Sequence, residues 1–236
     1  MIWGSFGEES GWPNISAKAI KALSYHLYSH LRAKTLSRPG TKPAKSPTNS
    51  AKGLNQLRII GGSWRGRKLG FPDVDGLRPT GDRIRETLFN WLAPDIQGAR
   101  CLDLFAGSGA LGLEALSRGA GESVLIEKHP LAAQSLIRNL ALLNAQDARV
   151  INTDALTYLA NTELQTAFDV IFIDPPFQLN LWQKTIDLLT QSRLPGEGCA
   201  IYVESGIKDD FQVPANWNLH RDKTTANLRY RLFYRT

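Results

Sequence analysis

Between residues 100 and 204, short apolar runs alternate with segments whose apolar residues recur at helical spacing. Strands that are apolar along their whole length are buried on both faces, and strands that alternate with helices are typical of a parallel sheet. Residues 217–235 instead predict a C-terminal antiparallel hairpin. We therefore expect an α/β fold with a mostly parallel sheet that helices cover on both faces. The strands are expected at 100–105, 123–127, 149–152, 168–174 and 200–204, and the helices at 110–118, 130–144 and 181–192.

The first 56 residues have a different composition. Residues 37–56 are rich in Pro, Gly, Ser, Thr and Lys, which is typical of a flexible linker. Residues 1–57 carry 8 Lys and Arg against 2 Asp and Glu, whereas residues 58–236 carry 20 of each, so the excess positive charge lies in this N-terminal part. We expect residues 1–56 to be a basic, largely disordered arm that could contain one amphipathic helix at 16–34.

A basic hairpin is expected next. Residues 57–60 and 67–71 are strand-like runs on either side of a glycine-rich turn, and the hairpin and its connection are expected to end at residue 80. Thr80 is expected to cap a helix that ends before Pro94. Residues 81–236 would then form the main domain.

Several classes of protein are excluded by composition. No apolar run reaches the roughly 18–20 residues of a membrane span. The start of the chain lacks the basic and apolar regions of a secretory signal. Cys101 and Cys199 lie in apolar runs and are read as reduced core residues, and His26 and His30, spaced i and i+4, lack a third ligand. We expect a cytoplasmic protein without a membrane span or a metal site.

Four acidic residues fall at or just beyond the ends of predicted parallel strands: Asp103, Glu127, Asp154 and Asp174. In sheets of this kind, ligands bind at the carboxyl ends of the strands, near the point where the strand order switches. A buried carboxylate needs a partner. One such residue could be an ordinary helix cap, but four in successive turns favour a shared ligand.

The turn after the first of these strands contains Gly107, Gly109 and Gly112, a match to G-x-G-x-x-G, with Glu127 about twenty residues after its first glycine. The match alone would suggest NAD. However, a dinucleotide places its pyrophosphate at this turn, and Asp103 would repel it. S-adenosylmethionine brings an ammonium and a sulfonium instead, so the acid favours this cofactor. Residues expected to bind it are Asp103, Phe105, Gly107, Ser108, Gly109, Glu127 and Asp154.

A second candidate segment, Asp174-Pro175-Pro176-Phe177, follows the strand at 168–174. The two prolines fix the backbone and remove two N–H donors, so the segment presents carbonyls and one carboxylate. Asp174 and the Pro175 carbonyl could accept both hydrogens of an exocyclic amino group, and Phe177 could stack on a base. Asp-Pro-Pro also occurs as a plain rigid turn. We expect Asp174, Pro175 and Phe177 to form the catalytic set.

These motifs, together with Leu57–Leu69, Leu77–Thr80, Arg83–Leu92 and Asp103–Arg118, resemble the bacterial 16S ribosomal RNA guanine-N2 methyltransferases of the RsmD type. The resemblance covers residues 57–236. It implies a Rossmann-like class I methyltransferase fold with a seven-stranded sheet, and methyl transfer from S-adenosylmethionine to one guanine of the small ribosomal subunit. Nothing requires more than a monomer. Residues that would then contact the RNA are Arg58, Trp64, Arg65, Arg67, Lys68 and Arg78.

Three alternatives remain at this point. A DNA adenine-N6 or protein-glutamine methyltransferase could use the same Asp-Pro-Pro-aromatic chemistry. A non-catalytic RNA-binding protein of ribosome assembly could keep the fold, although the intact cofactor residues argue against it. An NAD-dependent oxidoreductase is disfavoured by Asp103, and by the lack of a His or Tyr suited to hydride transfer near a strand end.

Overall fold

The computed structural model describes residues 55–74, 80–161 and 166–236. Residues 1–54 of the predicted arm at 1–56, with the helix at 16–34 and the histidine pair, lie outside these residues, and so does Arg78. Residues 55 and 56, which the sequence placed in the arm, belong instead to the first strand of the hairpin. Leu57, also in that strand, is buried in the core.

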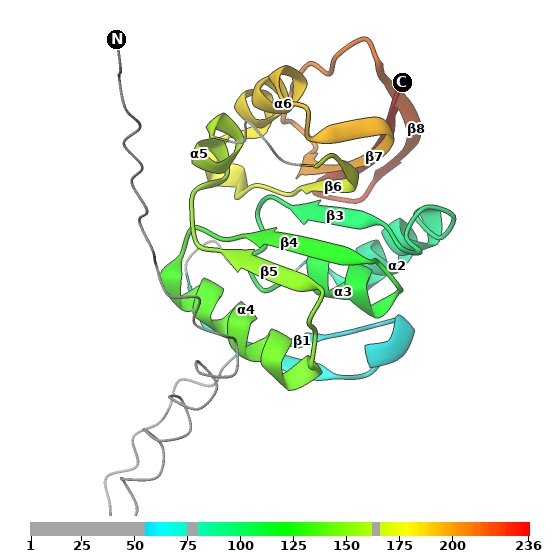
Figure 1. Ribbon diagram of the computed structural model, residues 1–236. Helices are drawn as coiled ribbons and strands as arrows, with labels where there is room; N and C mark the ends of the chain where they lie inside the picture. Colours follow the sequence, from blue (N-terminus) through cyan, green and yellow to red (C-terminus); the bar gives the residue numbers. More distant parts are fainter. Residues whose placement is uncertain (1–54, 75–79, 162–165) are drawn as a thin grey trace, which may run out of the picture. The chain divides into compact units, whose positions relative to one another are not determined.

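The main sheet has seven strands in the order β5-β4-β3-β6-β7-β9-β8 (Figure 1). The pairs from β5 to β7 are parallel, and β9 pairs antiparallel with both β7 and β8. The predicted seven-stranded sheet with its antiparallel C-terminal hairpin is confirmed. The strands are β3 (Arg100–Asp103), β4 (Glu122–Ile126), β5 (Ala148–Ile151), β6 (Phe168–Ile173), β7 (Pro195–Gly206), β8 (Trp217–Thr224) and β9 (Leu228–Arg235).

Helices cover both faces of this sheet because successive strand residues point to opposite sides. Leu102 and Ile171 face the helices α5 and α6, whereas their neighbours Cys101 and Phe172 face α2 and α3. The helix α4 packs on the same side as α3 through Leu125 of β4. Figure 1 shows α5 and α6 above the sheet and the other helices below it. The helices are α2 (Asp82–Trp91), α3 (Gly112–Ser117), α4 (Pro130–Leu143), α5 (Ala155–Ala160) and α6 (Trp182–Gln191).

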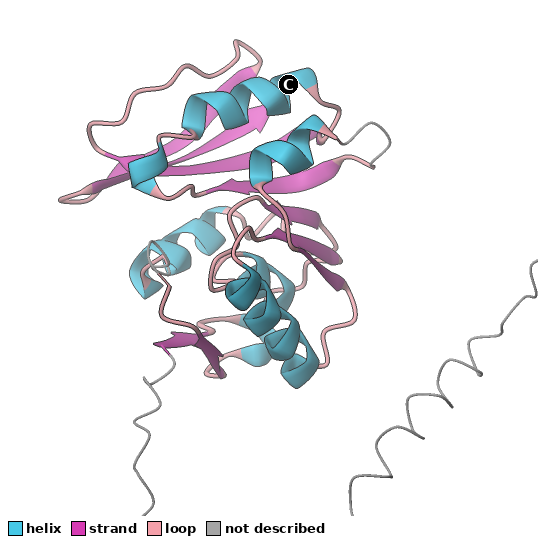
Figure 2. Cartoon of the chain, turned by 90° about the vertical axis from the view of Figure 1, so that its left-hand side faces the viewer, coloured by secondary structure: helices cyan, strands magenta, loops and turns pink. Residues whose placement is uncertain are grey.

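The hairpin of β1 (Asn55–Arg58) and β2 (Lys68–Phe71) forms a separate two-stranded sheet. Figure 2 shows it apart from the main sheet. Its apolar residues, including Leu57 and Phe71, share a core with α3 and α4. Two side chains of α4, Ser135 and Asn139, also donate hydrogen bonds of 2.8 and 3.0 Å to the Gly70 carbonyl of β2. The hairpin is therefore held on the helical layer below the main sheet.

A buried ion pair strengthens this attachment. The Glu114 side chain of α3 is fully buried and accepts the backbone N–H groups of Ile60 and Gly61, at 2.9 and 2.7 Å. The buried Arg85 of α2 lies 3.3 Å from Glu114, and Arg118 donates to it at 2.8 Å. Removal of one partner from a buried pair costs about 3–5 kcal/mol, since the other charge is left without compensation. Glu114 therefore joins the hairpin to two helices.

Close backbone contact at Gly62 completes this junction. Gly62 has a φ of +72°, and a Cβ at this position would lie 1.7 Å from the Ser117 carbonyl oxygen. The Ser117 hydroxyl also donates to the Gly61 carbonyl at 2.5 Å and accepts the Trp64 backbone N–H at 2.9 Å. Only a glycine can occupy position 62 while the turn stays this close to the end of α3.

Two local predictions were wrong. The sequence predicted Thr80 as a helix cap, but Gly81 precedes α2, no side chain caps it, and the Thr80 hydroxyl bonds to Asp174 instead. The sequence also missed α5, a helix of 6 residues that Asp154 caps through the backbone N–H groups of Leu156 and Thr157. The Thr80 hydroxyl is taken up by a residue 94 positions away, which no local pattern contains, whereas the cap of α5 is a local contact.

Within the three described stretches, no helix is long and apolar enough to cross a membrane. The same residues contain no group of three or more His, Cys, Asp or Glu side chains that could hold a metal ion.

Candidate active site

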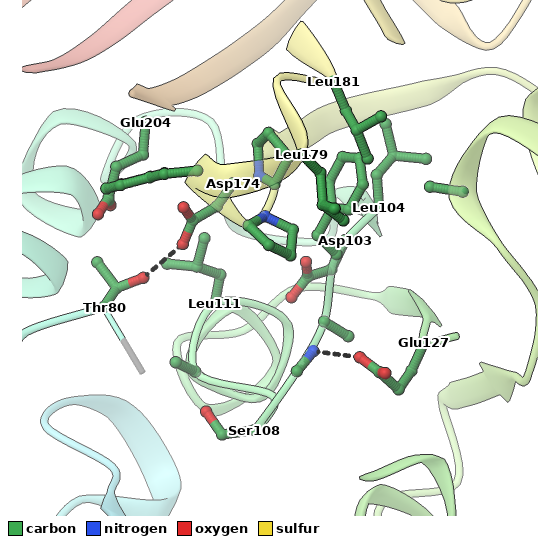
Figure 3. A pocket seen from close by; sticks show the side chains of 18 of the residues that line it. Thr80, Asp103, Leu104, Ser108, Leu111, Glu127, Asp174, Leu179, Leu181 and Glu204 are labelled. Atoms are coloured by element: carbon green, nitrogen blue, oxygen red, sulfur yellow. Dashed lines mark hydrogen bonds between the residues drawn. The ribbon is translucent and has the colours of Figure 1, made fainter. Parts of the chain in front are cut away.

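A pocket of about 710 Å³ opens at the carboxyl ends of the parallel strands, around the junction of β3 and β6 (Figure 3). The chain runs from β3 outward to β4 and β5 on one side, and to β6 and β7 on the other, so the strand order switches here. The turns after β3, β4, β5 and β6 line the pocket, and β7 contributes Glu204 near its carboxyl end, as such a switch point predicts. All four acidic residues identified from the sequence are among its lining residues: Asp103, Glu127, Asp154 and Asp174.

The glycine turn forms the floor of one half of the pocket. Gly107 and Gly109 have positive φ angles of +53° and +85°, which favour glycine. A Cβ on Gly109 would lie 2.6 Å from a methyl group of Leu136, and one on Gly112 would lie 2.7 Å from a methyl group of Leu125. The turn therefore needs these glycines for its backbone conformation and for packing against α4 and β4, independently of any ligand.

Asp103 is almost fully buried beneath this turn, with one carboxylate oxygen accepting the Gly112 backbone N–H at 3.0 Å. Burial raises the pKa of Asp103 to about 7, against hydrogen bonds from Gly112 and Phe105 that lower it, and Glu127 raises it further. A carboxylate held in this way is stabilised by a cationic group placed nearby. This half of the pocket suits a ligand with a positive charge. Phe105 lines the pocket above it and is half-buried.

Glu127 holds the turn from the end of β4. Its carboxylate accepts the Gly107 backbone N–H at 2.8 Å and that of His129 at 2.6 Å, and Figure 3 shows the first of these bonds. The Glu127 side chain thereby fixes the glycine turn, which lines the same pocket. Its oxygens have further acceptor capacity, because a carboxylate has about four lone-pair positions.

Asp154 and Ser108 complete this half. Asp154 caps α5 with one oxygen and pairs with Lys128 at 3.1 Å with the other. Burial works to raise its pKa, but the Lys128 ammonium and the backbone N–H groups keep it below the usual value. The Ser108 hydroxyl is buried in the pocket wall and has no hydrogen-bond partner among the described residues. A buried hydroxyl without a partner is costly, so a ligand that bonds to it would remove this cost.

The other half of the pocket belongs to Asp174-Pro175-Pro176-Phe177, directly after β6. Asp174 accepts a hydrogen bond of 3.0 Å from the Thr80 hydroxyl. Burial raises the pKa of Asp174 well above its usual value, and the neighbouring carboxylates of Glu204 and Asp103 add to this, whereas the bond from Thr80 lowers it. Thr80, which the sequence predicts as a helix cap, thus holds the Asp174 side chain in one position.

Phe177 stands at the edge of this half, with 38% of its surface exposed. Its ring lies 5.8 Å from the ring of the buried Trp182, at an angle of 39°. Trp182 is itself fixed, because its indole N–H donates to the Glu204 carbonyl at 2.8 Å. An exposed aromatic face on a rigid support can stack on a planar ligand.

Several residues that line the pocket are not predicted from the sequence. Among them are Thr80, which the sequence predicts as a cap, Glu204, which it predicts only as the end of a strand, and Asn227 and Leu228 at the start of β9. The apolar run before Glu204 gave one signal, since a charged residue at the end of a buried strand was the pattern used for the other four acids. The contributions of Thr80 and Asn227 depend on tertiary contacts that no local pattern reports.

The residues predicted to contact RNA lie on and around the hairpin, except for Arg78, which lies outside the described residues. Arg58 is exposed and pairs with Asp82 at 2.7 Å, and Arg67 donates to the Leu142 carbonyl at 2.9 Å. Arg65 and Lys68 are exposed, whereas the Trp64 side chain is half-buried against the core below the hairpin. The structure thus exposes the four described basic residues.

A parallel sheet with an antiparallel strand pair at its end, a glycine turn after its first strand and an acid-lined pocket at the switch point define a class I methyltransferase. The solved structure of an RNA methyltransferase from Salinibacter ruber, in complex with S-adenosyl-L-homocysteine, has the same fold, with a TM-score of 0.51 at 18% identity over 66% of this chain and 93% of that one. Within the class, this chain belongs to the family of ribosomal RNA small subunit methyltransferase D. The family model, described as "Conserved hypothetical protein 95", matches residues 57–234.

Individual relatives support this assignment. Ribosomal RNA small subunit methyltransferase D of Escherichia coli K12 is 53% identical over 192 residues, which cover 81% of this chain and 95% of that protein. The protein of the same name from Haemophilus influenzae is 46% identical over 191 residues, or 80% of this chain and 98% of its own length. The solved structure of yhhF from Escherichia coli has a TM-score of 0.72 at 51% identity, covering 77% of this chain and 98% of that one.

Proposed function

We propose that this chain transfers a methyl group from S-adenosylmethionine to the exocyclic N2 of one guanine in 16S ribosomal RNA of the small subunit. The observation that carries the proposal is a single pocket in which the acid-lined glycine turn and the Asp174-Pro175-Pro176-Phe177 segment face one another. One half suits a cationic cofactor, and the other suits the amino group of a base. The names of the relatives support ribosomal RNA of the small subunit as the substrate.

The cofactor is S-adenosylmethionine, which supplies a methyl group activated by its positive sulfur. The residues present fit it in three respects. Asp103 offers a buried carboxylate to a cation, Glu127 has lone pairs for two ribose hydroxyls, and the Ser108 hydroxyl needs a partner. Asp154 caps α5 and also lines the pocket, and it would meet the adenine.

Catalysis by this chain would consist mainly of positioning. The lone pair of guanine N2 is delocalised into the ring, so the amino group must be oriented before it can react. The Asp174 carboxylate and the Pro175 carbonyl would accept its two hydrogens, which directs the lone pair toward the other half of the pocket and stabilises positive charge that develops on nitrogen. The methyl group would pass from the sulfonium to N2, S-adenosylhomocysteine would leave, and N2 would lose one proton after the transfer. Asp174 therefore does not need to be a strong base.

The base would have to leave its stack to enter the pocket. Unstacking costs a few kcal/mol, and the exposed Phe177 ring would offset part of it by stacking on the base. The basic residues of the hairpin, Arg58, Arg65, Arg67 and Lys68, would meanwhile contact phosphates. All the proposed groups come from one chain, so we propose that a monomer is sufficient. We also propose that the protein acts in the cytoplasm.

The proposal is tested by incubating the protein with labelled S-adenosylmethionine and small subunits from a strain that lacks the enzyme. We expect label in ribosomal RNA, recovered as N2-methylguanosine after digestion to nucleosides. Recovery of N6-methyladenosine would instead support an adenine methyltransferase. A protein that binds the subunit and transfers no label would support the non-catalytic alternative.

A further inference from the structure

A second carboxylate lies beside Asp174 at the end of the neighbouring strand. In the parallel pair of β6 and β7, Phe172 lies opposite Tyr202 and Ile173 lies opposite Val203. The next residues in this register are Asp174 and Glu204, so their side chains leave the sheet on the same side. Figure 3 shows the two carboxylates next to each other, and both residues line the pocket. No step of the mechanism described above uses Glu204.

Glu204 is fixed from several sides. Its side chain is buried, and one of its oxygens, Oε2, accepts the hydroxyl of Tyr202 at 2.7 Å. Its backbone carbonyl accepts the indole N–H of Trp182, and Tyr230 of β9 lies opposite it in the sheet. Among the described residues, Tyr202 is the only donor to the side chain. Its second oxygen, Oε1, is therefore left with acceptor capacity at the wall of the pocket.

We propose that Glu204 reads the N1–H group of the target guanine and thereby selects guanine over adenine. The inference rests on the proposed function, and it assigns the specificity of the same site. The Watson–Crick edge of guanine presents the N2 amino group next to N1–H, so it offers donors side by side. Asp174 and Glu204 are neighbouring acceptors that match this pair, and flipped bases are read along this edge.

Adenine would meet the same two groups differently. Its N6 amino group could reach Asp174, but its N1 carries a lone pair instead of a hydrogen. A lone pair opposite the Glu204 carboxylate is repelled, and the buried carboxylate is left without the donor that guanine supplies. Sites built to bond one polar group reject analogues that lack it, because the buried partner stays unpaired. Burial raises the pKa of Glu204, whereas the Tyr202 hydroxyl lowers it, and the N1–H donor of guanine would stabilise the ionised form further.

The experiment uses 2-aminopurine, which keeps the N2 amino group but has a lone pair at N1. Once the methylated guanine has been mapped, small-subunit RNA is prepared with either guanine or 2-aminopurine at that position. The wild-type protein should methylate guanine far faster. In Glu204→Gln, the amide oxygen can still accept from Tyr202 while its NH2 group faces the base. We expect the guanine to 2-aminopurine rate ratio to fall at least tenfold.

The matched control is Glu197→Gln, because Glu197 lies on the same strand but is exposed and outside the pocket. It should leave the ratio unchanged. Binding of S-adenosylhomocysteine by both variants checks that the pocket is intact. If Glu204→Gln slows both substrates equally, Glu204 only supports Tyr202 and the inference is wrong. If the wild-type protein methylates no guanine at all, the proposed function itself fails, and the inference with it.

Discussion

The hydroxyl of Thr80 donates a 3.0 Å hydrogen bond to Oδ2 of Asp174, joining the residue before Gly81 and α2 to the end of β6. The same Thr80 accepts the Arg85 guanidinium at its carbonyl, at 3.1 Å. The proposed acceptor of the reacting amino group is thus positioned by the segment that connects the hairpin to the main domain.

Removal of this hydroxyl should move the pH profile. A hydrogen bond to the charged form lowers the pKa of a carboxyl group, so Thr80→Val should raise the pKa of Asp174 further above its usual value. The ionised carboxylate accepts the amino hydrogens, and the acidic limb of the kcat profile should therefore move to higher pH. Thr80→Ser, which keeps the donor, should stay close to wild type. An identical acidic limb in Thr80→Val would contradict the role of this bond.

Asp174→Ala should remove most of the activity while cofactor binding survives. Loss of one preorganised polar group at a reacting centre typically costs roughly 10²–10³ in kcat. Asp174→Asn keeps one carbonyl oxygen and should be less affected than the alanine variant. Single-turnover methylation of small subunits measures the rates, and calorimetry with S-adenosylhomocysteine measures binding. Loss of binding in Asp174→Ala would place this residue in the cofactor half of the pocket instead.

Cofactor binding should release a proton near neutral pH. Burial raises the pKa of Asp103 to about 7, and a cation beside it favours the ionised form. Between pH 6 and pH 7.5, affinity should therefore rise with pH, with up to one proton released at the lower end. Calorimetry in buffers of different ionisation enthalpy measures this number. Asp103→Asn should bind more weakly and lose the proton release, and an unchanged release would show that another group titrates.

The hairpin arginines should set the salt dependence of RNA binding. Each phosphate contact contributes about 0.7–0.9 to the slope of log K against log salt. Arg65→Ala combined with Arg67→Ala should therefore lower the slope by about 1–2. Arg193→Ala is the matched control, because Arg193 is exposed just before β7, at the end of the sheet opposite the pocket. An equal slope in the double variant and the control would exclude these arginines from the RNA interface.

Alanine substitutions at two glycines of the hairpin turn distinguish the cost of backbone strain from the cost of a steric clash. Gly62 and Gly66 have similar φ angles of +72° and +83°, but a Cβ on Gly66 would meet nothing within 4 Å. Both alanine variants carry the cost of a left-handed residue, about 1–2 kcal/mol. Gly62→Ala must also displace the Ser117 carbonyl. Its free energy of unfolding should fall by clearly more than that of Gly66→Ala. Equal losses would show that the Ser117 carbonyl can move away from position 62 at little cost.

Much of the main domain could be predicted from the sequence because its signals are local. The apolar strands, the glycine turn and the acids at the strand ends each occupy one short segment. The helix α5 is not predicted because its cap, Asp154, is interpreted as a ligand-binding residue, although the equally short α3 is found.

The missing parts of the site depend on residues far apart in the chain. Thr80 and Asp174 are separated by 94 positions, and a threonine before a helix favours a cap until its partner is known. Glu114 and Arg85 resemble ordinary charges on helix surfaces, yet both are buried. Burial of a charged side chain is decided by what covers it, and here the hairpin does so.

The anchorage of the hairpin has one further consequence. The Glu114 carboxylate accepts hydrogen bonds from the main-chain N–H groups of Ile60 and Gly61. The exposed side chains of Arg65 and Lys68 take no part in these bonds. Substitutions of the exposed hairpin side chains should therefore leave the contact between Glu114 and the hairpin backbone intact. Related proteins could adapt this face to a different stretch of nucleic acid while the frame that carries it stays the same.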